Sequence, residues 1–506
     1  MRAIRLSSKK ILFPLILAIL AGILISCDDD DEPPTPEVTA LNPSSAMPNT
    51  LISITGQGFS PVFSDNKVMF NGKEGLVSNA SQTQLNVIVP MDAQTGPVSV
   101  SINGRTAINQ PVFTVIPLPV EIASIMPTSG GYNTVVTING ANFFPTASNN
   151  TVTFNGIPGT VEAATATTLT VRVPARAGSG AVVVNGVAAG TPFTYRPDVY
   201  IVGHLYDNTG YSRVTYWKNG KPNTISNTGL NTYGNDIALI GDDVYVTGTR
   251  YVTTHNVARL WKNGTEIPLT NDATPSYADR IFTAGNDVYI AGYEGSGNFV
   301  AKYWKNGTPV NLTDGTSMAS VNSIVVNSED VYASGNSIHA NGNTVATYWK
   351  NGVAHTISSK VTFAHGLFVV GNDVYTTGSE RNTGPGVGFV TYWKNDSPVY
   401  LGPGLAGGAG YDIVVVGEDV YVAGVEDNAQ IVRVAKYWKN GAPVVLSDGS
   451  RPAFAQAIDV IGDDVYVVGH EYNAANRTVV KLWKNGVPTA ITDGGYFAGA
   501  EGIVLR

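Results

Sequence analysis

The sequence predicts an all-β protein made of two small sandwiches followed by an array of short, repeated sheets. Charged residues make up 14% of the 506 residues and glycine occurs 55 times, a composition too uncharged and too rich in glycine for helical bundles. Short segments of alternating apolar and polar residues, separated by Gly, Asn and Pro, run through residues 37–197, and seven similar segments fill residues 198–506. With 43% hydrophobic residues, a chain of this length can bury more than one core.

Residues 1–26 predict an export signal that ends at the only cysteine of the chain. Basic residues precede an apolar run at positions 11–25, which is shorter than the roughly 20 residues of a membrane-spanning helix. The L-I-S-C sequence that ends at Cys27 resembles the lipobox of bacterial lipoproteins, in which the cysteine becomes the acylated N-terminus. This resemblance implies attachment to outer-membrane lipid through acyl-Cys27. The alternative is an ordinary signal peptide that contains a cysteine by chance.

Residues 27–36 predict a solvated tether. Five acidic residues follow Cys27 directly and are followed by a proline-rich segment, which repels itself and can bury no core. The acidic run resembles the one that follows the acylated cysteine of lipoproteins carried to the outer face of the outer membrane, and this implies a position on the cell surface. The whole chain has a formal net charge of −8 and no basic patch, which argues against nucleic acid as a partner.

Residues 37–117 and 118–197 can be aligned with each other and predict two antiparallel sandwiches. Both modules contain an Asn-Gly pair, which supplies the positive φ angles of a tight hairpin turn. The G-Q-G-F sequence ending at Phe59, the G-A-N-F sequence ending at Phe143 and the F-N-G sequence of each module resemble IPT/TIG immunoglobulin-like domains. The resemblance implies spacer or binding sandwiches without catalytic chemistry.

Residues 198–506 contain seven repeats with a spacing of 43–45 residues. Each repeat has one Asp-Val-Tyr motif and one Trp-Lys-Asn-Gly motif, which reads Trp-Lys-Asn-Asp in the fifth copy. All tryptophans of the protein belong to this second motif: Trp217, Trp261, Trp304, Trp349, Trp393, Trp438 and Trp483. An Asn-Gly pair between strands favours a type I′ hairpin, and a period near 44 residues is typical of propeller blades. The repeats predict a seven-bladed β-propeller of four-stranded sheets.

The two ends of the repeat region predict how this propeller closes. The first Asp-Val-Tyr motif, at residues 198–200, has no apolar strand before it, whereas residues 500–506 form such a strand with no Asp-Val-Tyr after it. The C-terminal strand is therefore predicted to complete the first sheet, so that no strand edge is left open at the junction.

The seven tryptophans admit two interpretations. Indole faces stack on sugars, so a ring of them is a candidate aromatic platform for a glycan. Alternatively, one Trp per repeat packs between sheets, and we favour this because large aromatic side chains dominate buried contacts. The strand face that carries each Trp also carries Thr, Arg or Lys two residues before it, which leaves partial exposure of the indoles open.

A sharper candidate is a position where the repeats differ. The apolar strand that precedes Asp-Val-Tyr, replaced in the last copy by the C-terminal strand, is expected to be the innermost strand of each sheet. Two residues before the apolar residue at the centre of this strand, every copy has a polar side chain, of six kinds in all: Asn235, Asp279, Asn322, His365, Tyr411, Gln456 and Glu501. We expect them to surround one mouth of the central channel and to bind a ligand that lacks seven-fold symmetry. The alternative is an ordinary wet rim at which any polar residue suffices.

No catalytic or cofactor motif is present, so the sequence predicts a protein that is not an enzyme and holds no cofactor or metal. His204 and His470 fall in neighbouring repeats of a closed ring, but no third ligand accompanies them, and loop histidines are the favoured interpretation. Resemblance to surface glycan-binding lipoproteins with Ig-like stalks implies an extracellular glycan as the ligand. The alternatives are a protein–protein interaction or adhesion module and, third, a propeller polysaccharide hydrolase or lyase.

Overall fold

A computed structural model describes residues 35–226, 229–339, 342–381, 388–402 and 407–506. The predicted export signal, Cys27 and most of the tether lie outside these residues. The described chain is all-β: its helical segments are two short 3₁₀ turns, η1 (Phe63–Asp65) and η2 (Ala147–Asn149). Among the described residues we find no helix that could span a lipid bilayer. The chain divides into two compact units, Met1–Pro119 and Val120–Arg506, which we describe separately.

The first unit is a β-sandwich with an aromatic core. Its strands are β1 (Glu37–Asn42), β2 (Ser45–Ala46), β3 (Leu51–Gln57), β4 (Asn66–Phe70), β5 (Lys73–Ala80), β6 (Gln84–Ile88), β7 (Gly96–Ile102), β8 (Arg105–Thr106) and β9 (Val112–Val115). They pair in the order β1-β3-β6-β5-β4-β7-β9-β2, and β8 pairs with β7. Phe70 and Phe113 meet edge to face at 5.2 Å in the core, with no exposed surface. The predicted Asn-Gly turn is present, with φ of 44° at Asn71 and 85° at Gly72.

The second unit begins with a sandwich of the same plan. Its strands are β10 (Glu121–Met126), β11 (Ser129–Gly130), β12 (Val135–Ala141), β13 (Val152–Phe154), β14 (Ile157–Pro158), β15 (Thr160–Ala164), β16 (Thr168–Arg172), β17 (Val182–Val184), β18 (Val187–Ala188) and β19 (Thr194–Tyr195). One sheet has the order β10-β12-β16-β15 and the other β14-β13-β17-β18, while β11 pairs with β19. Phe154 and Phe193 repeat the edge-to-face contact at 5.2 Å.

Seven antiparallel four-stranded sheets follow. The first has the order β22-β21-β20-β47 and joins β20 (Val199–Tyr206), β21 (Ser212–Lys218) and β22 (Lys221–Thr224) to the C-terminal β47 (Ala498–Leu505). The other six are consecutive in sequence: β23 (Thr232–Ile240), β24 (Asp243–Val252), β25 (His255–Lys262), β26 (Thr265–Pro268); β27 (Ser276–Ala284), β28 (Asp287–Glu294), β29 (Val300–Lys305), β30 (Thr308–Asn311); β31 (Ala319–Asn327), β32 (Asp330–Ile338), β33 (Thr344–Lys350), β34 (Val353–Thr356); β35 (Thr362–Val370), β36 (Asp373–Arg381), β37 (Gly388–Lys394), β38 (Ser397–Tyr400); β39 (Gly408–Val416), β40 (Asp419–Asp427), β41 (Arg433–Lys439), β42 (Ala442–Val445); β43 (Ala453–Ile461), β44 (Asp464–Tyr472), β45 (Thr478–Lys484), β46 (Val487–Ala490).

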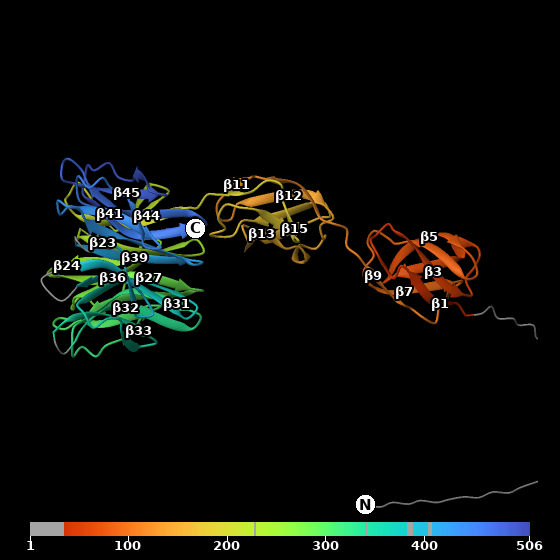
Figure 1. Cartoon of the computed structure of the whole chain (residues 1–506), viewed down its shortest axis with the longest axis horizontal. Coiled ribbons are helices and arrows are strands. Elements are labelled where there is room, and N and C mark those ends of the chain that lie inside the picture. The colour runs from red at the N-terminus through yellow and green to blue at the C-terminus, as the bar shows by residue number, and fades with distance from the viewer. Residues whose placement is uncertain (1–34, 227–228, 340–341, 382–387, 403–406) are drawn as a thin grey trace, which may run out of the picture. The chain divides into compact units, whose positions relative to one another are not determined.

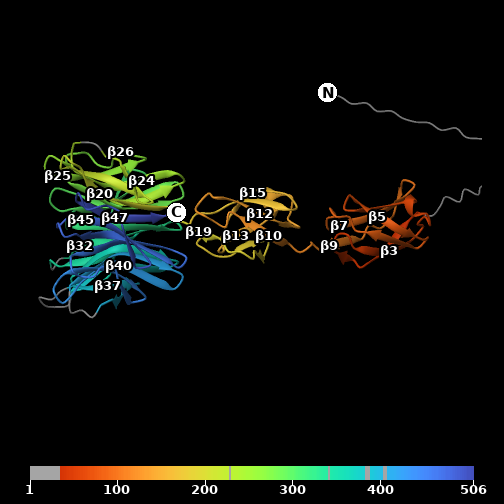
Figure 2. The same cartoon turned by 90° about the horizontal axis from the view of Figure 1, so that it is seen from above.

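One strand from each sheet forms a closed circle with those of the neighbouring sheets: the first along the chain in six sheets, and the C-terminal β47 in the remaining one. Strands β23, β27, β31, β35, β39 and β43 contact one another in this order, and β47 contacts both β43 and β23. Figure 1 and Figure 2 show the sheets side by side, with the C-terminal β47 among them. The predicted pairing of the C-terminal strand with the first repeat is present, because β47 runs antiparallel to β20 from Val199↔Leu505 to Leu205↔Ala498. We call these seven strands the inner strands and the whole array the ring.

The two repeated motifs fasten each sheet's turn between its third and fourth strands to its second strand. In every repeat the motif Asn has φ of 47–52°, and its Oδ1 accepts a hydrogen bond from the Val amide of Asp-Val-Tyr at 2.8–2.9 Å. The Lys after each Trp forms an ion pair of 2.7–3.0 Å with the Asp of Asp-Val-Tyr. These pairs are exposed and contribute little individually. The repeated Asp therefore has a structural role.

Candidate functional site

All seven polar side chains singled out by the sequence lie on β-bulges. The register of each inner strand shifts by one residue against the second strand of its sheet, and the extra residue is Asn235, Asp279, Asn322, His365, Tyr411, Gln456 or Glu501. A bulge bends the strand and redirects the extra side chain, and such bulges are common beside functional sites. All seven are half-buried, so the ring holds seven equivalent polar positions at one depth.

The bulges lie near the end of the ring that faces away from the second sandwich. The last residues of the inner strands, such as Val460 and Leu505, face the second sandwich, because their carbonyls accept hydrogen bonds from Arg176. The inner strands therefore begin at the opposite end, and each bulge follows the start of its strand by three residues. We call this opposite end the far mouth and the end at the second sandwich the base.

Direct contacts link several of the bulge residues to neighbouring sheets. The Nδ2 of Asn235 donates to the Ala278 carbonyl at 3.0 Å, and that of Asn322 donates to the Ala364 carbonyl at 2.6 Å. The rings of His365 and Tyr411 meet edge to face at 5.6 Å. These contacts fix the side chains across sheet boundaries, which preorganises the polar positions for a ligand.

The pKa values of Asp279, Glu501 and His365 are all shifted toward the neutral form of the side chain. Burial raises the pKa of Asp279 and of Glu501 to about 7, although the nearby Arg280 opposes the shift in both. Burial, reinforced by the charge of Arg280, lowers the pKa of His365 to about 4. A protonated carboxyl both donates and accepts hydrogen bonds, and so does a neutral imidazole. Near pH 7 the two carboxyls are therefore divided between protonated and ionised forms, whereas His365 is neutral.

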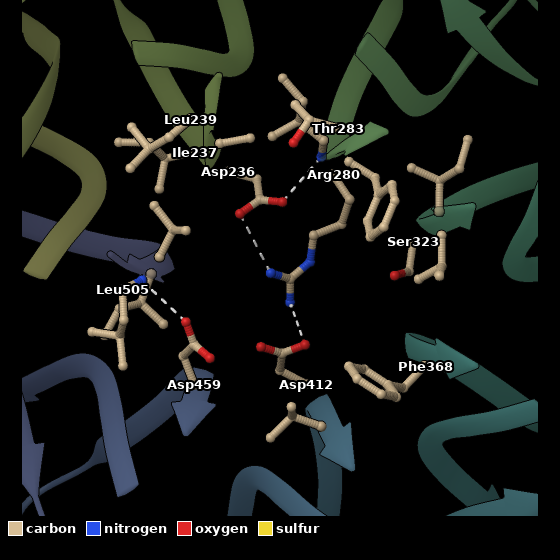
Figure 3. A pocket seen from close by; sticks show the side chains of 18 of the residues that line it. Asp236, Ile237, Leu239, Arg280, Thr283, Ser323, Phe368, Asp412, Asp459 and Leu505 are labelled. Atoms are coloured by element: carbon tan, nitrogen blue, oxygen red, sulfur yellow. Dashed lines mark hydrogen bonds and ion pairs between the residues drawn. The ribbon is translucent and has the colours of Figure 1, made fainter. Parts of the chain in front are cut away.

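The residue after each bulge contributes a cluster that the sequence analysis missed. Arg280 lies 3.7 Å from the Asp236 carboxylate and 3.4 Å from that of Asp412, on an inner strand that is not its neighbour (Figure 3). Asp236 also accepts the Ile281 amide at 3.0 Å, and Asp412 accepts the Ile458 amide at 3.0 Å. Burial acts to lower the pKa of Arg280, but the two carboxylates outweigh it and raise the pKa, so the guanidinium stays charged.

A comparison of equivalent positions in the seven repeats, which singled out the bulge residues, would also have found this cluster. The positions after the bulges also differ between repeats, as Asp236, Arg280, Ser323, Gly366, Asp412, Ala457 and Gly502. Three of them are charged, whereas the inner strands are otherwise mainly apolar at this depth. A charged residue in one copy of a repeated apolar strand is the signal that the sequence contains.

A cavity of about 570 Å³ extends from the Arg280 cluster to the base (Figure 3). Aliphatic and aromatic side chains of the inner strands line it: Ile237, Leu239, Ile281, Phe282, Ile324, Val326, Leu367, Phe368, Ile413, Val414, Ile458 and Ile503. Tyr132, Ala175 and Arg176 of the second sandwich complete its lining. The polar positions therefore lie on the far-mouth side of Arg280 and the apolar cavity on the base side.

An ion pair fastens the second sandwich to the base. The guanidinium of Arg176 donates to both carboxylate oxygens of Asp459, at 2.7 and 2.8 Å, and to the carbonyls of Val460 and Leu505. Asp459 also accepts the amides of Val460 and Leu505, at 2.8 and 3.0 Å. The guanidinium of Arg506 lies 4.8 Å from the centre of the Tyr132 ring. These contacts cover the base with the second sandwich and leave the far mouth free of it.

The seven motif tryptophans are the most deeply buried large side chains of the ring, each with an exposed fraction of 0 or 1%. Each indole packs against the preceding sheet of the ring. Trp349, for example, belongs to a cluster with Tyr289, Ala291 and Ala301. No indole face of this structure is open to a ligand, so the tryptophans have the placement that packing between sheets requires.

The strand face beside the tryptophans is buried, which corrects the expectation drawn from its polar residues. Thr215, Arg259 and Lys302 have exposed fractions of 0, 1 and 8%. Burial is tolerated because each finds a partner: Arg259 pairs with Glu266 at 2.8 Å, and Lys302 pairs with Glu294 at 2.5 Å. Polar residues on a strand face thus indicate solvent only when no partner lies on the adjacent strand.

His204 and His470 lie in neighbouring sheets of the ring. Burial lowers the pKa of both to about 4, and His470 lowers that of His204 further. His204 packs against Tyr206 and Tyr233 at 6.1 and 5.1 Å. Within the described ranges, no group of three or more His, Cys, Asp or Glu side chains is placed to hold a metal ion.

We expect the carboxyls of Asp279 and Glu501 to make folding stability depend on pH. Because their pKa values are raised in the folded state, their stabilising contribution is full below about pH 4 and is lost as the pH rises to about 7. The histidines His204, His365 and His470 act in the opposite direction, because their pKa values are lowered. The measurement is therefore a difference: unfolding free energy of wild type minus that of the Asp279→Asn, Glu501→Gln variant, between pH 4 and 8. A difference that does not fall with pH would contradict buried, protonated carboxyls.

Comparison with known proteins identifies the sandwiches. The IPT/TIG domain model matches residues 36–115 and 119–195, which confirms the resemblance seen in the sequence. No curated protein matches the chain. Among solved structures, a protein of unknown function from Bacteroides thetaiotaomicron VPI-5482 is 13% identical, with a TM-score of 0.42, over 76% of this chain and 98% of that chain.

Two further solved structures have names that describe a function. An auxiliary nutrient binding protein from Bacteroides thetaiotaomicron VPI-5482 is 14% identical, with a TM-score of 0.30, over 72% of this chain and 98% of that one. The surface glycan-binding protein PbSGBP-B from Prevotella bryantii is 15% identical, with a TM-score of 0.26, over 44% of this chain and 60% of that one. The chain is thus an all-β protein with IPT/TIG domains at residues 36–115 and 119–195.

Proposed function

We propose that the protein is a lipid-anchored binding protein of the cell surface, in which a seven-bladed β-propeller binds an extracellular glycan at its far mouth. The propeller interpretation is supported by seven four-stranded sheets, by the closed circle of inner strands and by the pairing of β47 with β20. The anchor is supported by the lipobox-like sequence at Cys27 and the acidic segment after it.

The observation that carries the binding function is the contrast between repeated backbone and unrepeated side chains at the bulges. All seven inner strands bulge at the equivalent residue, yet six kinds of polar side chain occupy these residues. Packing in a repeated scaffold favours repeated residues, as the seven buried tryptophans illustrate. Varied amide, carboxyl, imidazole and phenol groups supply the convergent hydrogen bonds that a hydroxyl-rich ligand without seven-fold symmetry needs.

The proposed role is not catalytic, but one observation favours a hydrolase or lyase as the second candidate. A carboxyl with a pKa near 7 can act as a general acid at neutral pH, and both Asp279 and Glu501 have such values. Release of new reducing or unsaturated sugar ends from a polysaccharide, abolished in the Asp279→Asn, Glu501→Gln variant, would establish the enzyme. Retention of polysaccharide without such release supports binding.

We expect the protein to be retarded in native gels that contain a soluble polysaccharide, and the Gln456→Ala variant to be retarded less. Gln456 is the bulge residue of β43 and is half-buried at the far mouth. Loss of its amide removes hydrogen bonds worth about 1 kcal/mol, or about a fivefold loss of affinity. The panel contains xyloglucan, arabinoxylan, mixed-linkage β-glucan, galactomannan and mucin glycans.

The matched control is Gln110→Ala, which removes an exposed amide from the first sandwich. It should bind as wild type. Wild-type mobility that no polysaccharide changes would refute glycan binding, and a protein–protein or adhesion role would then replace it. Equal affinity of Gln456→Ala and wild type for a retained polysaccharide would place the site away from the bulges.

A further inference from the structure

Six aromatic side chains gather on one part of the far mouth. Tyr206, Tyr233 and Phe497 come from the sheets of β47 and β23, and Tyr277, Tyr293 and Phe299 come from the next sheet, that of β27. We call these six residues the aromatic arc. They occupy three consecutive sheets of the ring, which gives the far mouth an aromatic side.

The first three members of the arc contact one another. The Tyr206 and Phe497 rings meet edge to face at 6.3 Å, and the hydroxyls of Tyr206 and Tyr233 lie 3.4 Å apart. Phe497 keeps 45% of its surface exposed, and its neighbour Tyr496 keeps 50%. This end of the arc is therefore both ordered by ring contacts and open to solvent.

The other three members form a second cluster that adjoins the bulge residues. The Tyr277 and Tyr293 rings stack at 4.7 Å with an interplanar angle of 24°, and Phe299 meets Tyr293 at 5.0 Å. Burial raises the pKa of the Tyr293 hydroxyl, and the bulge residue Asp279 raises it further. Since Asp279 acts on Tyr293 electrostatically, the arc and the polar positions belong to one region.

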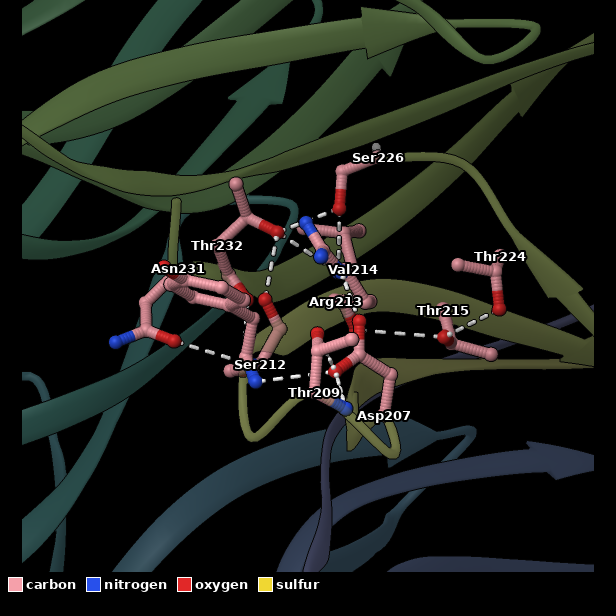
Figure 4. Close-up of polar contacts among 11 residues, drawn as sticks. Asp207, Thr209, Ser212, Arg213, Val214, Thr215, Thr224, Ser226, Asn231 and Thr232 are labelled. Atoms are coloured by element: carbon pink, nitrogen blue, oxygen red, sulfur yellow. Dashed lines mark hydrogen bonds and ion pairs between the residues drawn. The ribbon is translucent and has the colours of Figure 1, made fainter. Parts of the chain in front are cut away.

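The loop that follows Tyr206 is fixed by a carboxylate (Figure 4). Asp207 accepts the amides of Thr209 and Tyr211 at 2.9 and 3.1 Å, and it pairs with Arg213 at 2.7 Å. The Thr209 hydroxyl, which also donates to this carboxylate, lowers the pKa of Asp207 most, and Arg213 and the two amides lower it further, so the carboxylate stays ionised. A fixed loop holds Tyr206 before a ligand arrives, which lowers the entropic cost of binding.

We propose that the aromatic arc is the surface on which the pyranose rings of an uncharged polysaccharide stack, while the bulge residues bind its hydroxyls. This inference rests on the proposed function and adds the class of glycan and the side of the mouth that it occupies. Aromatic faces bind the C–H faces of sugars and exclude water from them. The net charge of −8 and the carboxylates beside Arg280 disfavour anionic polymers, so the ligand is neutral.

The test measures retention on the neutral polysaccharides of the panel, chiefly xyloglucan, β-glucan and galactomannan. Phe497→Ala removes an exposed ring from one cluster, and the double variant with Phe299→Ala removes a ring from each cluster. We expect affinity for the retained polysaccharide to fall about threefold in the single variant and about tenfold or more in the double variant. A cooperative thermal unfolding transition, measured for each variant, serves as the check that the variant is folded.

The matched control is Phe144→Ala, because Phe144 is exposed to 42% in the second sandwich and Phe497 to 45% in the arc. Normal affinity of the control with reduced affinity of the arc variants supports the inference. Normal affinity of folded arc variants, with Gln456→Ala still weakened, would overturn the arc and leave the proposed function intact. Retention on acidic polysaccharides alone would overturn the neutral class, and no retention of wild type at all would overturn both proposals.

Discussion

Replacing Asp459 by Ala is expected to lower the free energy of unfolding of residues 120–506 by about 2–4 kcal/mol. Asp459 is 9% exposed and accepts four hydrogen bonds, two from Arg176 and two from backbone amides. The alanine leaves the amides of Val460 and Leu505 without this acceptor at a buried junction. It also leaves the Arg176 guanidinium without its counter-charge.

Calorimetry on the whole protein measures this effect, because loss of the junction should also separate the melting of the second sandwich from that of the ring. Asp463→Ala is the matched control, since Asp463 lies in an exposed turn of the same sheet, and it should change stability by less than about 0.5 kcal/mol. Arg176→Ala should cost less than Asp459→Ala because its side chain is 43% exposed, against 12% for Asp459. Identical calorimetric melting curves of wild type and Asp459→Ala would show that this ion pair does not attach the second sandwich to the ring.

This junction bears on function because it determines which end of the ring the second sandwich covers. Arg176 belongs to an IPT/TIG domain, and the resemblance to that family implies a spacer or binding sandwich. Its contacts with Asp459 and Leu505 make the second sandwich a cover for the base of the ring as well. The bulge residues and the aromatic arc lie at the other end, where described residues of the second sandwich make no contact with them.

The repeated part of the fold could be predicted because its contacts repeat. Each Trp-Lys-Asn-Gly motif carries its own hairpin φ angles and its own bonds to Asp-Val-Tyr within about 22 residues, so the sequence contains the same local pattern seven times. The pairing of β47 with β20 was predictable for a related reason, since the incomplete first repeat and the surplus last strand complement each other. Local, repeated interactions leave a pattern in the sequence.

The unrepeated contacts could not be predicted. Arg176 and Asp459 are 283 residues apart, and no local preference places them together. Arg280 bridges Asp236 of the neighbouring inner strand and Asp412 of a distant one, a pairing that depends on the diameter of the closed ring. The bulge residues were found as a set because they break a repeat, whereas the bulge that redirects each side chain became visible only in the strand register.

Replacing Trp349 by Ala is expected to destabilise the ring by about 3–5 kcal/mol, the usual cost of removing a large, buried aromatic side chain. Trp349 is 1% exposed and fills the interface between its own sheet and Tyr289, Ala291 and Ala301 of the preceding one. The small alanines on that sheet cannot move to fill the space, so a cavity remains. Chemical denaturation with fluorescence or circular dichroism measures the loss, with Val353→Ala, an exposed residue of the next strand, as the control.

The same variant separates packing from binding. Below its melting temperature, Trp349→Ala should bind a polysaccharide that retains wild type with unchanged affinity, because no face of the indole reaches solvent. For the aromatic arc we expect the opposite combination of effects. Phe497→Ala removes an exposed ring, so it should weaken polysaccharide binding with little loss of stability. Reduced binding of a folded, stable Trp349→Ala would instead require the sheets to part and expose the indole. That would assign the repeated tryptophans, rather than the arc, to the ligand.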